Sequence, residues 1–319
     1  MKTIITGGAG FIGSNLAVGL LETDEVVLVD NFSTGDSRYL DGVLGGLEIF
    51  DLDISRTSPT ELAKVFHGCD RIFHLAANAD VRGGWSNTKR DIDQNIIATH
   101  NVAEATRLAR VSEVVFASTG CVYGDSTLIP TPENEPFPIQ TSLYGMSKMA
   151  AEGIFSSYSA QGAFKSTILR FVSVLGRNYH HGHVIDFVRK LKSNPNSLQI
   201  LGDGTQKKSY INVADCTRAF VDLRGKSNFE VFNIGHNYFL PVFESARLIA
   251  RYMELEPEIL LSEGSRGWIG DNPFTFLDIS KAKEFGWEPS ISIETSVEET
   301  VTYLLENQWV LDKIDYRNS

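Results

Sequence analysis

The sequence predicts an α/β fold in which a doubly wound parallel sheet carries a smaller α/β lobe. Short apolar runs alternate with longer amphipathic stretches along the chain, as repeated βαβ units require. The first run leads directly into a glycine-rich turn and then an amphipathic stretch. The chain has 319 residues. Because single hydrophobic cores stop growing at about 250 to 300 residues, we expect a second lobe.

The predicted strands are runs of four to six residues rich in Val, Ile and Phe: Lys2–Thr6, Val26–Asp30, Leu47–Phe50, Arg71–Leu75, Glu113–Ser118 and Ser166–Phe171. Such runs are typical of a parallel sheet that is buried on both faces. Amphipathic patterns predict helices at 11–22, 58–67, 88–110, 142–161, 182–193, 213–224, 241–252 and 293–307.

A change of composition after Phe171 indicates where the second lobe begins. A loop rich in Gly, Asn and His leads to a helix and then to a turn at 201–204. The segments Ser209–Asp215 and Glu230–Gly235 again have the pattern of sheet strands. We therefore predict a discontinuous organisation. The larger domain comprises residues 1–172 plus 209–237, and the smaller lobe comprises 173–208 plus 238–319.

Charge and cysteine content limit the partners and the compartment. Lys and Arg total 29 against 40 Asp and Glu, so the formal net charge is −11 and a nucleic-acid partner has no electrostatic basis. Cys69, Cys121 and Cys216 fit neither a metal-ligand spacing nor a disulfide framework, which favours a reducing compartment. We find no signal-peptide pattern and no apolar stretch of about 18 residues. We therefore predict a cytoplasmic protein without a membrane partner.

The glycine-rich turn has the spacing of a dinucleotide-binding site. Gly7, Gly10 and Gly13 form a GxxGxxG pattern between the first strand and the first helix, where helix N–H groups favour a pyrophosphate. The next strand ends at Asp30, 17 residues after Gly13. A carboxylate there accepts hydrogen bonds from a ribose diol and repels a 2′-phosphate, so NAD is favoured over NADP. The alternative is that Asp30 only starts a turn with Asn31.

A YxxxK pattern lies near the start of a predicted helix. Tyr144 and Lys148 are four residues apart, which places both side chains on one helix face. A nearby ammonium and an oxidised nicotinamide both favour the ionised phenol, so Lys148 would activate Tyr144 as a base. Thr119 follows the fifth strand and could bond the same substrate oxygen. In isolation the pair could also simply pack on a helix surface.

Together these motifs resemble the extended short-chain dehydrogenase/reductase family, whose larger domain is a Rossmann-type fold. The HLAA run at 74–77, Asn95, the STGCVYG run from Ser118, the GWxGD-like stretch at 267–271 and the LDISKAKEFGW segment from Leu277 carry the same likeness. Within the family the chain is most similar to UDP-glucose 4-epimerase and related nucleotide-sugar epimerases.

The resemblance implies an NAD-binding larger domain, a lobe that binds a nucleotide sugar such as a UDP-sugar, and a homodimer. The expected catalytic residues are Thr119, Tyr144 and Lys148. The expected cofactor-binding residues are Gly7, Gly10, Phe11, Ile12, Gly13, Asp30, Asn31, Ser33, Gly35, Asp53, Ile54, Leu75, Ala76, Ala77, Asn95, Ser118, Tyr144, Lys148 and Phe171. The expected substrate-binding residues are Val81, Thr119, Cys121, Tyr144, Ser173, His183, Val184, Lys208, Trp268 and Asp271. No metal ligand is expected, although His180, His181 and His183 cluster on one loop.

Some positions depart from the family pattern. Ser173 stands where many epimerases have Asn, Lys208 replaces the usual Arg, and Trp268 replaces another Arg, which leaves Arg266 as the nearest guanidinium. Thr275 occupies a position whose bulk limits the sugar 2-substituent, and its small size suggests that an N-acetyl group could fit.

Two further positions separate the reactions that the family performs. In its dehydratases the hydroxyl residue is followed by Asp and Glu, and its decarboxylases usually carry Glu at the second of these positions. Here the residues are Gly120 and Cys121, which favours 4-epimerisation through a 4-keto sugar. A dehydratase, decarboxylase or 4-keto reductase on the same scaffold is the first alternative, and a non-catalytic dinucleotide-binding protein is the second.

Overall fold

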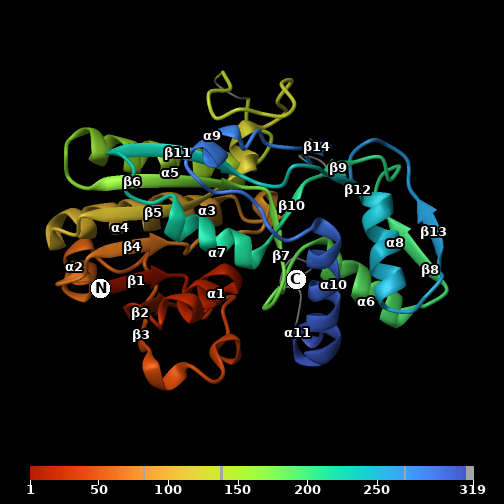
Figure 1. The fold of residues 1–319 in the computed structure, drawn as a ribbon, viewed down its shortest axis with the longest axis horizontal. Helices are drawn as coiled ribbons and strands as arrows, with labels where there is room; N and C mark the ends of the chain where they lie inside the picture. Colours follow the sequence, from red (N-terminus) through yellow and green to blue (C-terminus); the bar gives the residue numbers. More distant parts are fainter. Residues whose placement is uncertain (82, 137–138, 269–270, 314–319) are drawn as a thin grey trace.

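The computed structural model describes residues 1–81, 83–136, 139–268 and 271–313. A large parallel sheet lies between two layers of helices, and a smaller lobe packs at one end of it (Figure 1). The sheet order is β11-β6-β5-β4-β1-β2-β3. The strands are β1 (Lys2–Thr6), β2 (Glu25–Asp30), β3 (Glu48–Asp51), β4 (Arg71–His74), β5 (Glu113–Thr119), β6 (Lys165–Phe171) and β11 (Phe229–Ile234). The predicted doubly wound α/β fold is confirmed.

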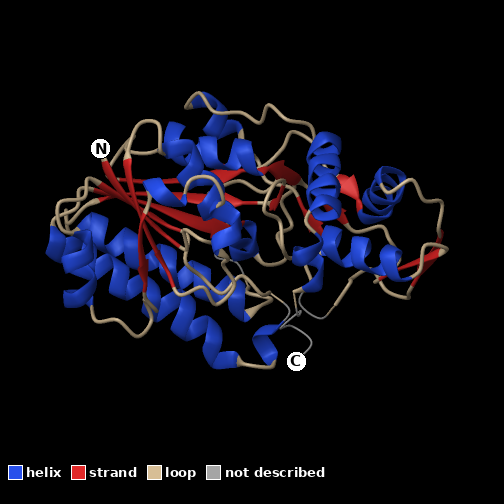
Figure 2. Cartoon of the chain, turned by 90° about the horizontal axis from the view of Figure 1, so that it is seen from below, coloured by secondary structure: helices blue, strands red, loops and turns tan. Residues whose placement is uncertain are grey.

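Helices cover both faces of this sheet, as the side view in Figure 2 shows. One face packs against α1 (Phe11–Leu20), α7 (Val213–Asp222) and the segment with α9 (Ser280–Glu284). The other packs against α2 (Pro59–Phe66), α4 (Ala98–Ala109) and α5 (Leu143–Ala160). The strands are apolar on both sides because each face is covered, so Ile4, Val27 and Ile72 have no exposed surface.

The smaller lobe has its own apolar core around four helices: α6 (His183–Ser193), α8 (Val242–Tyr252), α10 (Ile293–Glu306) and α11 (Gln308–Asp312). Short strands pair across long sequence separations at its edges. They are β7 (Ser173–Leu175) with β10 (Tyr210–Asn212), β8 (Ser197–Ile200) with β13 (Glu258–Leu261), and β9 (Lys207–Lys208) with β12 (Leu240–Pro241) and β14 (Phe274–Thr275).

Two predicted elements differ from the structure. The segment Ser209–Asp215 contains only the three-residue strand β10, which pairs with β7 and does not join the large sheet. The strand ends early because the Asn212 side chain accepts a hydrogen bond from the Ala214 N–H and so starts α7. The predicted helix 88–110 is divided into α3 (Thr88–Asp91), the π-helix η4 (Ile92–Ile97) and α4.

Single turns of 3₁₀-helix connect several elements: η1 (Ser37–Leu40), η2 (Leu44–Gly46), η3 (Gly83–Trp85) and η5 (Gly120–Tyr123). No helix within the described ranges is long and apolar enough to cross a membrane.

Candidate active site

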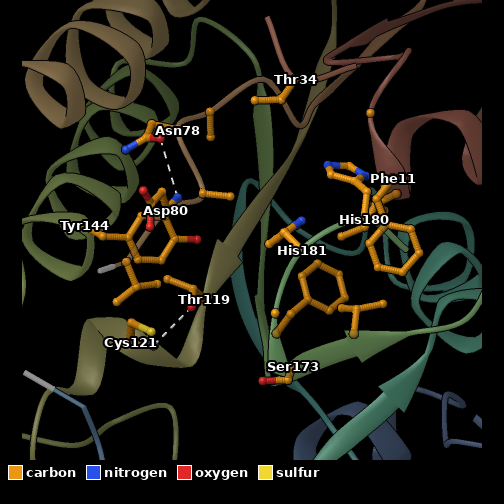
Figure 3. A pocket seen from close by; sticks show the side chains of 18 of the residues that line it. Phe11, Thr34, Asn78, Asp80, Thr119, Cys121, Tyr144, Ser173, His180 and His181 are labelled. Carbon is orange, nitrogen blue, oxygen red and sulfur yellow. Dashed lines mark hydrogen bonds between the residues drawn. The ribbon is translucent and has the colours of Figure 1, made fainter. Parts of the chain in front are cut away.

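A cavity of about 910 Å³ opens at the carboxyl ends of the large sheet's strands. Ligands of doubly wound folds bind at this edge because the loops after parallel strands meet there. The smaller lobe supplies the opposite wall through α6, β9 and β14. Tyr144, Thr119 and Cys121 lie on one side of the cavity, and Phe11 and His180 lie on the other (Figure 3).

The glycine turn brings the start of α1 to the cavity wall. Gly7 has φ +70°, and a Cβ there would lie 2.7 Å from the backbone nitrogen of Ala76. A Cβ on Gly13 would lie 2.1 Å from the Gly7 carbonyl oxygen. No side chain caps α1 at Gly10. The N–H groups of the first turn therefore form a site that fits a diphosphate.

Asp30 lies on the cavity wall at the end of β2 and is 8% exposed. One carboxylate oxygen accepts the N–H of Ala9 at 2.9 Å and the other accepts the N–H of Phe32 at 2.8 Å. Burial raises the pKa of this carboxyl group, and the two backbone bonds oppose that shift. Asp30 thus joins the glycine turn to the following loop, and each oxygen keeps a lone pair for a ribose hydroxyl.

Tyr144 and Lys148 come from the first turns of α5, whose Ser142 side chain caps the helix by accepting the Gly145 N–H at 3.0 Å. Burial raises the pKa of the Tyr144 phenol, and its hydrogen bond with Thr119 lowers it in part. The thiol of Cys121 and the carboxyl of Asp91 also raise this pKa. In this structure the phenol is therefore protonated at neutral pH, and its activation requires an added positive charge.

Lys148 is 3% exposed, and its ammonium lies 4.1 Å from the centre of the Phe116 ring. Burial lowers the pKa of Lys148 to about 7, against a raising influence from Glu152. The activation of the Tyr144 phenol by Lys148 beside an oxidised nicotinamide stays a prediction.

A buried ion pair behind the catalytic helix was not predicted from the sequence. The two carboxylate oxygens of Glu152, one turn beyond Lys148, share the N–H of Arg170 Nε, and one of them also accepts from Nη2 at 2.6 Å. Its other neighbour is the Ser118 hydroxyl, which donates to it. This cluster fixes α5 against β5 and β6. The sequence signal was the acid at four-residue spacing after Lys148.

Most of the predicted site residues line this one cavity, and three do not: Asp53, Asn95 and Val184. Asp53 accepts the backbone N–H and hydroxyl of Ser55. Asn95 is buried in the π-helix, where it donates to the Asn78 carbonyl and the Ser147 hydroxyl. The Val184 side chain has no exposed surface and packs in the core of the lobe.

Lys208, the cation expected to bind substrate, makes contacts within this chain. The Lys208 ammonium donates to Asp271 at 2.9 Å and also to the Asn272 carbonyl. Arg266 pairs with Asp125 at 2.8 Å and donates to the Asp271 carbonyl. The GWxGD-like stretch includes residues 269 and 270, which lie outside the described residues.

His180 and His181 of the loop and His183, the first residue of α6, all line the cavity. His183 lies 2.9 Å from the Ser245 hydroxyl and stacks on Tyr210. Within the described parts of the chain, no group of three His, Cys, Asp or Glu residues is placed to hold a metal ion.

The fold and the site together define an enzyme of the extended short-chain dehydrogenase/reductase type. The model of the NAD-dependent epimerase/dehydratase family matches residues 3–235, and the chain belongs to that family. NAD is its cofactor, and NAD-bound structures are among its structural neighbours. The glycine turn, the uncapped start of α1 and Asp30 fit this group.

Similar proteins carry the names of nucleotide-sugar enzymes. The chain is 30% identical to a putative UDP-glucose 4-epimerase of Methanocaldococcus jannaschii, with 95% of this chain and 98% of the relative covered. A UDP-galactose 4-epimerase crystal structure has a TM-score of 0.86 and 34% identity, over 97% of this chain and 100% of that one. The Thermotoga maritima UDP-glucose 4-epimerase with UDP-glucose has a TM-score of 0.88 and 30% identity, over the same shares. UDP-sugar decarboxylases also match.

Proposed function

We propose that the protein is an NAD-dependent nucleotide-sugar 4-epimerase of the UDP-glucose/UDP-galactose type. The observation that carries the proposal is the cavity wall at Tyr144. The phenol bonds to Thr119, and the two residues that follow this hydroxyl are Gly120 and Cys121. Inversion at one carbon needs a single acid–base group beside the cofactor, whereas loss of water or carbon dioxide needs further acid–base groups.

When bound, NAD supplies the acceptor and later the donor of the hydrogen on the sugar C4, through a 4-keto sugar. Tyr144 removes the proton of the 4-hydroxyl group and returns it to the same oxygen. Thr119 orients that oxygen, and Lys148 holds the nicotinamide ribose. Because burial raises the pKa of the phenol, Tyr144 must first lose its own proton to solvent, and a positive charge beside it would favour that loss.

The first alternative, a dehydratase or decarboxylase, would need another acid near the sugar. One acid that lines the cavity is Asp80. Its carboxylate accepts the Gly83 N–H at 3.0 Å, as a turn-forming Asp does. We propose that Asp80 shapes this loop and takes no part in the chemistry.

The test is to incubate the purified protein with UDP-glucose, UDP-N-acetylglucosamine and UDP-glucuronate, and to read product masses and sugar NMR spectra. A 4-epimerase gives products of unchanged mass with an inverted C4. Thr275 lines the cavity and supports acceptance of the N-acetyl sugar as well. Loss of water or carbon dioxide, abolished by Asp80→Asn, would establish the alternative. No turnover on any sugar would support a non-catalytic protein.

We also propose a homodimer formed through α4 and α5. Ile92, Ile97 and Leu108 lie along the η4–α4 helix and are about two-fifths exposed, so these apolar side chains are available for a contact between two chains. Light scattering should give the mass of two chains, and Leu108→Glu should shift it to one.

A further inference from the structure

The loop that follows Asp30 forms the cavity wall at residues 31–36, where the adenosine half of NAD is expected. On its inner side this loop is tied to the glycine turn, because the Asp36 N–H donates to the Ala9 carbonyl at 2.9 Å. Gly35 packs against the same carbonyl, which would lie 2.9 Å from an added Cβ. The loop therefore cannot move without disturbing the cofactor-binding turn.

On its outer side the same loop meets α11, at the far end of the sequence. The Arg38 guanidinium lies 3.8 Å from the centre of the Trp309 ring, and the Tyr39 ring lies 5.3 Å from it. The Lys313 ammonium pairs with Asp36 at 2.8 Å, and these side chains are 29% and 14% exposed. Lys313 and Asp36 both line the cavity. These contacts therefore close the cavity wall at its adenosine end.

The helix α11 is itself fixed to the smaller lobe. Arg189 of α6 donates to the carbonyls of Leu311 and Lys313, each at 2.9 Å, and to that of Val310 at 3.3 Å. The side chains of Val310 and Leu311 are buried in the lobe core. The α11 contacts thus connect the cofactor loop to a rigid part of the opposite lobe.

A second set of contacts joins the same loop to the lobe. The Tyr39 ring stacks on His180 with 5.4 Å between ring centres. Asn178 donates to the Tyr39 carbonyl at 3.2 Å and to the Ser14 hydroxyl of α1 at 2.8 Å. The loop is therefore held on both sides, and Figure 3 shows His180 beside Phe11 at the start of α1.

We propose that Trp309, Arg38 and Lys313 are positioning residues that form a clasp between α11 and loop 31–40, and that this clasp slows the release of NAD. The residues act through Asp36 and the loop, because the adenosine end of the cavity opens only when the α11 contacts break. Retention would serve the proposed epimerisation, in which the reduced cofactor must stay bound between two half-reactions. Retention itself rests on NAD binding and not on the identity of the sugar.

The test measures NADH dissociation from the full-length protein without any sugar. Bound NADH is chased with excess NAD, and the loss of bound-cofactor fluorescence gives the rate. Trp309→Ala should raise this rate about threefold, since it removes a solvent-exposed cation–π contact, and Arg38→Ala should raise it further because it also removes the Arg38–Asp36 ion pair at 2.7 Å. Trp309→Phe and Arg38→Lys keep a ring and a cation and should restore slow release.

The matched control is Arg247→Ala, which removes a cation–π contact with Phe243 at 4.7 Å on α8 and away from the loop. Its NADH release should equal that of the unchanged protein. If Trp309→Ala fails to fold, Lys313→Ala tests the same clasp through its ion pair with Asp36 and should raise the rate about threefold. Rates within twofold of the unchanged protein for both Arg38→Ala and Lys313→Ala, or an equal increase in Arg247→Ala, would overturn the proposal. Because no sugar is present, failure of the epimerase proposal would leave this result unaffected.

Discussion

The two walls of the cavity are built in different ways. On the cofactor wall, Gly7, Asp30 and Thr119 lie at the carboxyl ends of strands of the large sheet, so they reach the same edge by regular parallel pairing. On the substrate wall, the groups lie on two- or three-residue strands that pair across long separations, as Lys207–Lys208 pairs with Phe274–Thr275. One wall is therefore specified by local sequence, and the other by the packing of distant segments.

The largest expected effect is on the chemistry of the cofactor wall. Tyr144→Phe should lower kcat by about 10² to 10⁴, because it removes the only proposed acid–base group, while NAD stays bound. The decrease in kcat is measured by following C4 inversion of UDP-glucose in quenched time-course assays. The matched control is Tyr158→Phe on the same helix, whose hydroxyl donates to Glu104 at 2.9 Å away from the cavity. Turnover of Tyr144→Phe within a few-fold of normal would remove this residue from the mechanism.

The next prediction tests whether the glycine turn specifies the cofactor wall. Gly13→Ala should abolish NAD binding and lower the free energy of unfolding by about 1–3 kcal/mol, because the new Cβ meets the Gly7 carbonyl at 2.1 Å. Gly19→Ala lies on the same helix with no atom within 4 Å of its Cβ, so it should stabilise the protein by roughly 0.5–1 kcal/mol. Urea unfolding and NAD titration measure both. If the two variants had the same stability and the same NAD affinity, the close approach of Gly13 to the Gly7 carbonyl would not explain the turn.

A smaller effect tests the substrate wall. Lys208→Gln should raise the KM for the nucleotide sugar about tenfold with little change in kcat or NAD affinity, because it removes a cation that faces the cavity. It should also lower the melting temperature, since Asp271 is 3% exposed and would lose its partner. The neighbour Lys207 is exposed and packs over Phe239, so Lys207→Gln should leave KM unchanged. If Lys207→Gln raised the KM and Lys208→Gln did not, the substrate contact proposed for Lys208 would be wrong.

The last expected effect is confined to acid solution and concerns protein stability beneath the cofactor wall. Burial lowers the pKa of His74 to about 3, with a further lowering influence from Lys148. The unfolded chain binds this proton near its ordinary value of about 6.5, so unfolding takes up a proton between about pH 6.5 and pH 3. Stability should fall by up to ~1.4 kcal/mol per unit as the pH drops through that window. His74→Gln should flatten this slope in urea unfolding, whereas the exposed His67→Gln should not. If the pH dependence of the unfolding free energy were unchanged in His74→Gln, other groups would cause the loss of stability in acid.

The sequence alone predicted the large sheet and the groups at its edge. Strand runs and the glycine spacing are local patterns, and parallel pairing brings their carboxyl ends together whatever the rest of the chain does. Thr119, Tyr144 and Lys148 could therefore be placed around one cavity before any coordinates. Asn95 fell outside the cavity wall because the π-helix η4 buries it beneath the neighbouring loop.

Only the tertiary structure decided the charges of the site and the contacts of its second wall. The raised pKa of Tyr144 and the lowered pKa of Lys148 come from burial, which depends on every element packed above α5. Lys208 pairs with Asp271, and Arg38 lies over the Trp309 ring. The residues of each pair are so far apart in the sequence that no local pattern predicts their contact. Periodicity and spacing act over a few residues, whereas desolvation and ion pairing depend on which distant segments share a surface. For that reason the sequence specified the reacting groups, and the folded chain set their protonation and enclosure.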